Sequence, residues 1–417
     1  MTRQRRLDTA AGRLPLGGGW EFAGAAATFT SVYLAAGALM PLLVVYKERW
    51  ALPATLLTLA FAVFAVGFLV AVLILGSLSD RVGRRPVLIG ALIVQLASNV
   101  MFLVAPDIGW VIAARVAQGF ATGAATTAFT AALVELAPPS RKALGAAIGG
   151  VSLTGGLAAG SFLAGLVVQL TTHANAVVFV VLSVATASGI GVVACTPETV
   201  TRVPGALRAL IPRVAVPPSA RREFTAALPV LAAIWMIAGL SGGLAPSLVR
   251  SVFLVNSGLL NGLSGSVAPA MSALVAIAVG RLSARRAMTG GMYASVVGVV
   301  GIVGGVSAGS LAIMIIGQAI AGAGFGASFA AALRLVVPLA MEHERGGLAA
   351  AIYVVSYAAF GVPVVLAGQA AGPFGMVSTV FWFGVAAVVL ALLGLGAQQG
   401  LARACANPSD AVTTAAG

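Results

Sequence analysis

Residues 76–88 read Gly-Ser-Leu-Ser-Asp-Arg-Val-Gly-Arg-Arg-Pro-Val-Leu and form a short charged connection between two long apolar stretches. The connection contains one carboxylate, three arginines and two glycines, namely Gly76, Asp80, Arg81, Gly83, Arg84 and Arg85. Glycine permits sharp turns and close backbone approach, and Pro86 suits the first turn of a following helix. A loop that only anchors its flanking segments would account for the arginines, but not for the carboxylate and the glycines at this spacing. We therefore expect this stretch to do more than anchor the chain.

The composition on both sides of this connection is that of an integral membrane protein. Hydrophobic residues make up 60% of the 417 residues, charged residues make up 8%, and the mean hydropathy is +1.05, which excludes an ordinary soluble domain. A helix needs about 20 apolar residues to cross the hydrocarbon core, and the chain has enough such stretches for roughly a dozen crossings. These stretches lack the alternating pattern of barrel strands. The sequence therefore predicts an all-α membrane protein with twelve transmembrane helices.

The predicted spans are separated by short joins, most of which carry charges. The spans cover residues 22–46, 53–76, 86–105, 109–134, 143–169, 175–195, 225–248, 258–280, 287–306, 309–334, 346–370 and 375–398. They predict an N-terminal six-helix bundle at 22–195 and a C-terminal six-helix bundle at 225–398. A cytoplasmic N-tail at 1–21, a cytoplasmic linker at 196–224 and a cytoplasmic C-tail at 399–417 complete this organisation.

An internal repeat supports two related halves. The stretch that begins at Gly280 repeats the stretch that begins at Gly76 at an offset of 204 residues, and Ala350-Ala351-Ile352 repeats Ala146-Ala147-Ile148 at the same offset. Two pseudo-symmetric halves of six helices with a binding site between them are a common transporter architecture. The repeat is not symmetric in its chemistry, because Ala284 stands where the first half has Asp80. Ionisable groups are therefore concentrated in the N-terminal half.

The distribution of basic residues predicts the orientation of the chain. If both termini are cytoplasmic, nineteen of the 24 lysines and arginines lie on the inner side, as the positive-inside rule requires. This asymmetry accounts for the net charge of +13 without any nucleic-acid partner, since no soluble basic face is present. We expect a multi-pass protein of the cell (inner) membrane, and the abundance of arginine, alanine and glycine points to a bacterial source.

The connection at 76–88 resembles the signature loop of the major facilitator superfamily, Gly-x-Leu-Ala-Asp-Arg-x-Gly-Arg-Arg, between helices 2 and 3 of those transporters. Only Ser79 departs from the pattern, because alanine is usual there. The resemblance implies halves that rock about a central binding site and a gating role for the loop. It also implies that Asp80 faces the N-terminal end of a helix near residues 346–349 when the transporter opens outward. A carboxylate is stabilised at a helix N-terminus, so Asp80 would act as a latch.

Two residues are predicted to couple conformation to transport. Glu135 ends the span at 109–134, and the resemblance implies that it pairs with Arg81 or Arg84. Arg115 lies in Arg-Val-Ala-Gln-Gly, which resembles the second motif of the family, Arg-x-x-Gln-Gly. An arginine within a membrane span is costly and usually faces a cavity or a partner. The alternative is that Arg115 extends its side chain toward the membrane surface.

The substrate cavity is predicted from helix periodicity. Arg115, Gln118, Thr122 and Thr126 recur at spacings of three and four residues and share one helix face, which we expect to be a cavity wall. Other spans contribute further candidates, which are Tyr33, Trp235, Met236, Gln318, Tyr353 and Tyr357. Ordinary helix packing is the alternative for each of these side chains.

The proton gradient is the predicted energy source, and no cofactor is expected. Gly156 stands where the antiporter motif of the family has a proline, and no carboxylate lies near the middle of a span. Proton coupling would therefore rest on Asp80, Glu135, Glu21 or the charge of the substrate. The sequence has no cluster of histidines and cysteines that could bind a metal.

These observations predict a secondary transporter and exclude the common enzyme classes. The sequence has no phosphate-binding Gly-Lys-Ser/Thr loop, and its two Gly-x-Ser-x-Gly matches lie in glycine-rich apolar spans rather than after strands. We expect a monomer in the lipid bilayer that moves small molecules by alternating access, as a proton-coupled exporter of drug-like or metabolite compounds. An uncoupled facilitator or importer is the first alternative. A transport-inactive sensor or partner with the same fold is the second.

Overall fold

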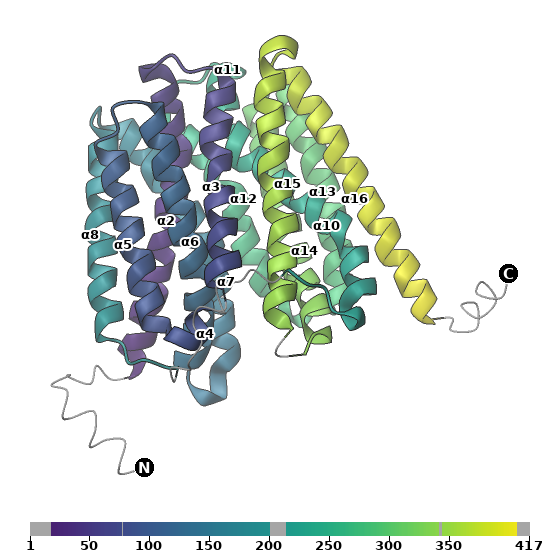
Figure 1. The fold of residues 1–417 in the computed structure, drawn as a ribbon. Helices are drawn as coiled ribbons and strands as arrows, with labels where there is room; N and C mark the ends of the chain where they lie inside the picture. The colour runs from purple at the N-terminus through teal and green to yellow at the C-terminus, as the bar shows by residue number, and fades with distance from the viewer. Residues whose placement is uncertain (1–17, 77, 201–213, 342–343, 407–417) are drawn as a thin grey trace.

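The computed structural model describes residues 18–76, 78–200, 214–341 and 344–406. The structure is entirely helical over these residues, and the helices run along a common direction (Figure 1). Most of the predicted N-tail, the centre of the linker at 201–213 and the end of the C-tail lie outside the described residues. The boundaries predicted for these three segments therefore remain predictions.

The first group of helices consists of α2 (Gly18–Arg49), α3 (Ala54–Leu75), the short α4 (Ser79–Val82), α5 (Arg84–Leu103), α6 (Ile108–Leu136), α7 (Lys142–Leu170) and α8 (Ala174–Cys195). The second group consists of α10 (Arg221–Gly239), the π-helical turn η3 (Leu240–Leu244), α11 (Ala245–Ser251), α12 (Gly258–Ala278), α13 (Ala284–Ser307), α14 (Leu311–Val336), α15 (Arg345–Phe374) and α16 (Met376–Ala406). Short 3-10 turns lie at η1 (Pro139–Arg141), η2 (Pro218–Ala220), η4 (Val279–Arg281) and η5 (Val337–Leu339).

Eleven helical segments in the described part of the chain are long and apolar enough to cross a membrane, with α10, η3 and α11 forming one of them. The long helix α6 is not among the eleven, although its 29 residues exceed the length that a crossing needs. It carries Arg115, Gln118 and four threonines, which lower its hydropathy. In Figure 1 it runs between α2 and α3 along the full height of the first group. Polar residues rather than insufficient length thus set α6 apart.

The predicted spans coincide with these helices with one exception. The predicted span 225–248 is not a single regular helix, because the π-helical turn at Leu240–Leu244 interrupts it. Side-chain caps account for several helix starts, since Asp107, Ser257 and Ser310 each accept a hydrogen bond from a backbone N–H in the first turn of the following helix. These helix ends are therefore encoded locally.

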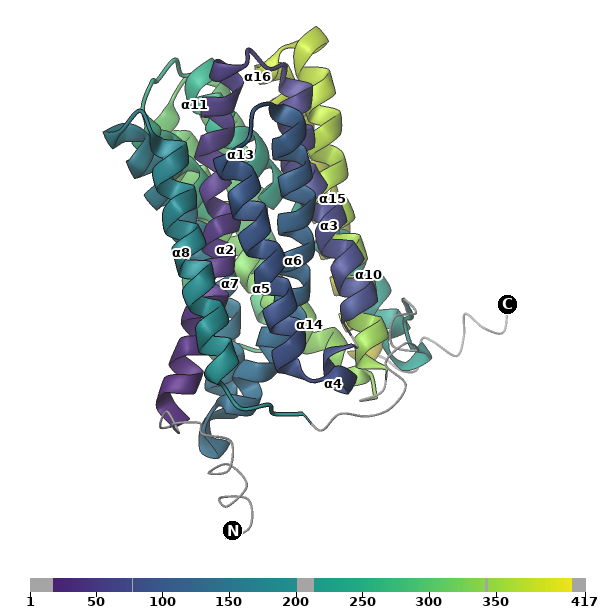
Figure 2. The same ribbon diagram turned by 60° about the vertical axis from the view of Figure 1, so that its left-hand side comes forward.

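The two groups meet most closely at the end of the molecule opposite α4, which we call the far end. There Gly165 of α7 lies against Gly258 and Gly262 of α12, with the backbones in direct contact. Thr58 of α3 packs against Gly368 of α15 at the same end. Small residues let membrane helices approach this closely. Figures 1 and 2 show α4 at the opposite end, which we call the α4 end.

Candidate functional site

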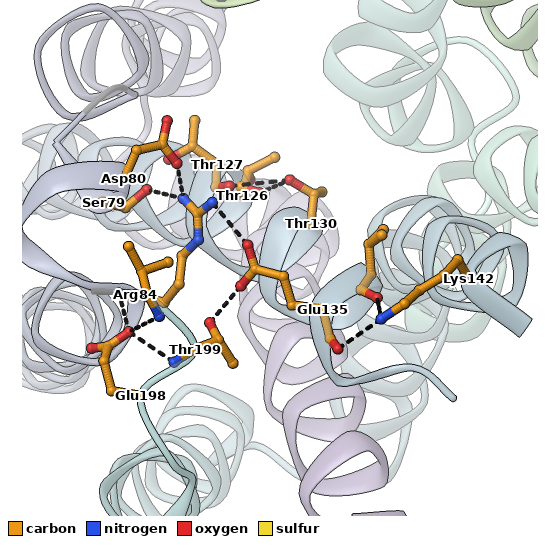
Figure 3. A network of polar contacts seen from close by, with 12 residues as sticks. Ser79, Asp80, Arg84, Thr126, Thr127, Thr130, Glu135, Lys142, Glu198 and Thr199 are labelled. Carbon is orange, nitrogen blue, oxygen red and sulfur yellow. Dashed lines mark hydrogen bonds and ion pairs between the residues drawn. The ribbon is translucent and has the colours of Figure 1, made fainter. Parts of the chain in front are cut away.

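The connection that the sequence predicts to act in gating is organised around one arginine at the α4 end. Arg84 binds the carboxylate of Asp80 at 2.5 Å, the hydroxyl of Ser79 at 2.6 Å and the carboxylate of Glu135 at 3.1 Å (Figure 3). These contacts join α4, α5 and the end of α6. We call Ser79, Asp80, Arg84, Glu135, Glu198 and Thr199 the Arg84 network. Glu135 therefore contacts Arg84, one of the two partners that the sequence predicted.

Ser79, the one residue that departs from the family pattern, has a specific role in this structure. Its side chain is fully buried, and its hydroxyl accepts a hydrogen bond from Arg84. An alanine at this position could not make that bond. The serine thus adds an uncharged acceptor to the two carboxylates around the guanidinium.

Glu198 connects the start of the linker to the loop. Its carboxylate accepts hydrogen bonds from the backbone N–H groups of Arg84 at 2.8 Å and Arg85 at 3.1 Å. The next residue, Thr199, donates its hydroxyl to Glu135. The first N–H groups of a helix lack partners within the helix and attract negative charge. Glu198 therefore caps α5 from a segment more than a hundred residues away.

The two glycines of the loop have different roles. Gly83 has a φ of +111°, a conformation that other residues rarely adopt, and the Glu198 carboxylate occupies the space that a Cβ would need. Gly76 has helical backbone angles at the end of α3. Glycine is required at the Gly83 turn, because a side chain there would collide with the Glu198 carboxylate that caps α5. Arg81 lies on α4 beside this turn.

No hydrogen bond or ion pair within the described part of the chain joins Asp80 to the start of α15 in this conformation. Its side chain is 60% exposed and pairs with Arg84 one turn further on. The latch at residues 346–349 therefore remains a prediction for the conformation in which the α4 end closes. In the present conformation Asp80 is paired with Arg84 instead.

Removing the side chain of Glu198 (Glu198→Ala) is expected to destabilise the protein by about 1 kcal/mol, the usual value of a helix cap. Two backbone N–H groups of α5 lose their acceptor in this variant. Thermal unfolding in detergent measures the effect. Glu198→Gln is the control, because an amide oxygen still accepts these bonds, and its melting temperature should lie between the two. Equal melting temperatures for all three proteins would contradict the capping role.

A central cavity lies between the two groups of helices. Its wall includes Tyr33 from α2, Phe61 and Phe64 from α3, Arg115 from α6, Leu153 from α7, Trp235 from α10, Ser241 from η3, Ser272 from α12, Phe325 from α14, and Tyr357 and Phe360 from α15. Arg115 is the only charged residue among all the residues that line the cavity as described. The cavity is thus apolar and aromatic with one cation.

Arg115 is bound to the neighbouring helix and not extended toward the membrane surface. Its side chain is buried and donates hydrogen bonds to the backbone carbonyls of Ala60 and Phe61, both at 3.2 Å. A third bond goes to the Oε1 of Gln118 at 2.7 Å, and the guanidinium lies 4.5 Å from the ring centroid of Phe64. None of the ion pairs among the described residues includes Arg115. These hydrogen bonds of the Arg115 guanidinium therefore all go to uncharged oxygens.

Some of the predicted cavity residues line the cavity, and the others do not. Arg115, Tyr33, Trp235 and Tyr357 line the cavity, whereas Gln118, Thr122, Thr126, Met236, Gln318 and Tyr353 are not part of its wall. The hydroxyls of Thr122 and Thr126 bind carbonyls of their own helix, and Thr126 also bonds Tyr33 at 2.8 Å. Tyr33 thus contacts the polar face of α6 at Thr126, and among the four predicted residues of that face only Arg115 lines the cavity.

Sequence reasoning missed three polar residues of the site. Glu198 and Thr199 lie in the linker, where no periodicity or motif marks them. Ser241 lines the cavity from the π-helical turn η3. In the sequence, only a serine followed by two glycines inside an apolar span marks this position. Single π-helical turns inside helices are frequent at functional sites.

Comparison with known proteins agrees with this arrangement. The sequence profile of the Major Facilitator Superfamily matches residues 25–362. No curated protein sequence matches the chain significantly. Among solved structures, a mutant of the peptide transporter POT in complex with alafosfalin aligns with a TM-score of 0.74 and 14% identity, over 92% of this chain and 95% of that chain.

Two further structures show the same fold. The human organic anion transporter MFSD10 (TETRAN) aligns with a TM-score of 0.66 and 17% identity, over 91% of this chain and all of that chain. A POT family transporter in complex with 5-aminolevulinic acid aligns with a TM-score of 0.73 and 12% identity, over 93% and 96% of the two chains. At these identities the likeness concerns the fold alone.

Proposed function

The chain belongs to the major facilitator superfamily, and on that premise we propose that it is a secondary transporter that exports small organic solutes in exchange for protons. In this proposal the two groups of helices alternate between closure at the far end and closure at the α4 end. The termini lie in the cytoplasm, and one copy of the chain in the cell membrane is sufficient. Drug-like compounds and metabolites are the solutes proposed.

The observation that carries the proposal is the central cavity between two groups of helices whose closest backbone contacts lie at the far end. Glycine contacts join α7 to α12 at the far end, while Asp80 is exposed at the α4 end. The cavity contains a buried arginine, which in a membrane span marks a functional site by default. Asp80 and Glu135, two of the three carboxylates of the Arg84 network, are the groups proposed to couple transport to protons.

An uncoupled facilitator is the second candidate, and the lining of the cavity favours it. No aspartate, glutamate or histidine is among the residues that line the cavity in the described part of the chain. A proton would therefore have to act at the Arg84 network, outside the cavity. An uncoupled facilitator needs no titratable residue in its cavity.

Flux into proteoliposomes separates the candidates. The purified chain is reconstituted, and uptake of a panel of labelled solutes is followed with and without an imposed pH gradient. Flux that rises with the gradient is expected for the exporter, and flux indifferent to it would favour the facilitator. Absence of flux for every solute would overturn both and leave a transport-inactive protein.

A further inference from the structure

We propose that the central cavity binds a small amphipathic organic acid, with the carboxylate at Arg115 and the apolar body against the aromatic wall. This inference rests on the proposed transport function, because it names the substrate class of the same cavity. It is carried by three features: an unpaired buried charge, hydrogen-bond donors without acceptors, and an apolar lining free of acidic groups.

The charge of Arg115 is the first feature. A guanidinium has five N–H groups, and the contacts to Ala60, Phe61 and Gln118 use three of them. Two N–H groups are thus left for an incoming oxygen, one on each terminal nitrogen. A buried charge without a counter-charge is costly, and an anionic ligand would relieve that cost. Guanidinium groups favour carboxylates in particular, because their fork geometry matches two oxygens.

Unused donors in the same wall are the second feature. The indole Nε1 of Trp235 and the hydroxyl of Ser241 are buried, and neither has a hydrogen-bond partner in the described structure. Both residues line the cavity that Arg115 lines. Buried polar groups are nearly always paired in native proteins, so two unpaired groups facing one cavity indicate a ligand that pairs with them. An indole donates only, which requires an acceptor on the ligand.

The polar groups of the wall come from both groups of helices. The ring of Phe61 lies 5.9 Å from the Arg115 guanidinium and also packs against Gly242 and Gly243 of the turn that holds Ser241. Arg115 and Ser241 approach the cavity from opposite groups of helices, so a ligand that binds Arg115 and reaches Ser241 would bridge the groups.

The aromatic wall is the third feature and determines the rest of the ligand. Trp235 packs edge-to-face with Phe325 and Phe360 and lies 4.9 Å from the ring of Tyr357. Such a wall accepts an apolar or aromatic body by burial of its surface. Aromatic faces also attract cations, but Arg115 repels a second positive charge in an environment of low polarity. The cavity therefore favours an acid over an amine of the same shape.

The test is direct binding to the purified full chain in nanodiscs at pH 7. Three probes of matched size are titrated by calorimetry: 2-naphthoate, its neutral amide, and 2-naphthylmethylammonium. We expect 2-naphthoate to bind at least about tenfold more tightly than the other two, a difference of about 1.4 kcal/mol. Equal affinities, preference for the amine, or no binding of any probe at millimolar concentration would overturn the proposal.

Variants assign the preference to the proposed groups. Arg115→Gln should remove the preference for 2-naphthoate, and Arg115→Lys should restore part of it. Arg334→Gln is the matched control, since Arg334 also binds two backbone carbonyls but lies outside the cavity, and it should bind like the parent. If Arg115→Gln does not fold, Trp235→Phe and Ser241→Ala test the same site, because each removes one donor. Each should weaken the binding of 2-naphthoate but not that of 2-naphthylmethylammonium, which has no acceptor.

The outcome is distinct from that of the flux experiment. Acid binding that depends on Arg115, without flux of any solute, would refute the proposed transport and support the assignment of the cavity. Flux of neutral or cationic solutes without acid binding would refute the assignment and support transport.

Discussion

Replacing Asp80 with asparagine (Asp80→Asn) is expected to lower the initial rate of transport roughly tenfold, while the amount of protein in the membrane stays unchanged. A carboxylate at a helix N-terminus contributes about 0.3–1 kcal/mol, and up to ~2 kcal/mol when partly buried. A loss of about 1.4 kcal/mol changes a two-state equilibrium tenfold. The exposed ion pair with Arg84 adds little to stability, so folding should be preserved. Initial rates in proteoliposomes, normalised to reconstituted protein, measure the effect.

Asp107→Asn is the matched control for this prediction. Asp107 is also an aspartate in a short connection, but it lies at the far end, where it caps α6 by accepting the N–H of Trp110 at 3.1 Å. Asparagine caps helices as well as aspartate does, so this variant should transport at the parental rate. Parental rates in both variants would refute the latch, and poor insertion of Asp80→Asn alone would point to a structural role.

The second large effect is expected at the contact between the two groups. Replacing Gly262 with leucine (Gly262→Leu) should reduce transport by more than about tenfold. A Cβ at Gly262 would lie 2.6 Å from the Ser161 carbonyl and 2.7 Å from the Cα of Gly165, and backbone atoms cannot move aside. Overpacking typically costs about 1–3 kcal/mol in a close-packed contact. The helices α7 and α12 must separate, and the far-end closure is lost.

Cysteine labelling tests this separation directly. With Cys195 and Cys405 replaced by serine, a cysteine at Ser161, which is fully buried here, should react with a water-soluble maleimide faster when Gly262 is leucine than when it is glycine. Gly150→Leu is the matched control on α7, because nothing lies within 4 Å of a Cβ added at Gly150. It should transport normally. An unreactive cysteine in Gly262→Leu would show that the two groups accommodate the side chain.

The helices could be predicted from the sequence because their signals are local. Apolar length places the spans, and caps such as Asp107 and Ser310 mark where helices begin. The interruption at Leu240–Leu244 could not be predicted in this way. It depends on packing, since Gly243 lies against Phe61 and Val364 from helices distant in sequence.

The site was predicted in part for the same reason. Arg84 and Glu135 were paired through a motif whose residues are close in sequence or tied to a helix end. Glu198 was missed because its role depends on where the linker passes in space, which no pattern encodes. The threonines of α6 were misplaced because helix periodicity gives a shared face but not the side chain that covers it. Here Tyr33 covers Thr126 from another helix.

The position of the glycine contact between α7 and α12 determines how far the α4 end moves when the two groups of helices tilt. Gly165 lies near one end of α7, and the helix begins at Lys142, so the contact is about 35 Å from the other end at ~1.5 Å per residue. If the two groups of helices tilt about that contact, the other end of α7 moves much farther than the contact itself. A tilt of only about 10° would swing the opposite tip by ~6 Å, a distance comparable with the width of an aromatic ring system. Opening the α4 end while the far end stays closed would then require no helix to unwind. Gly165, Gly258 and Gly262 would only have to roll over one another.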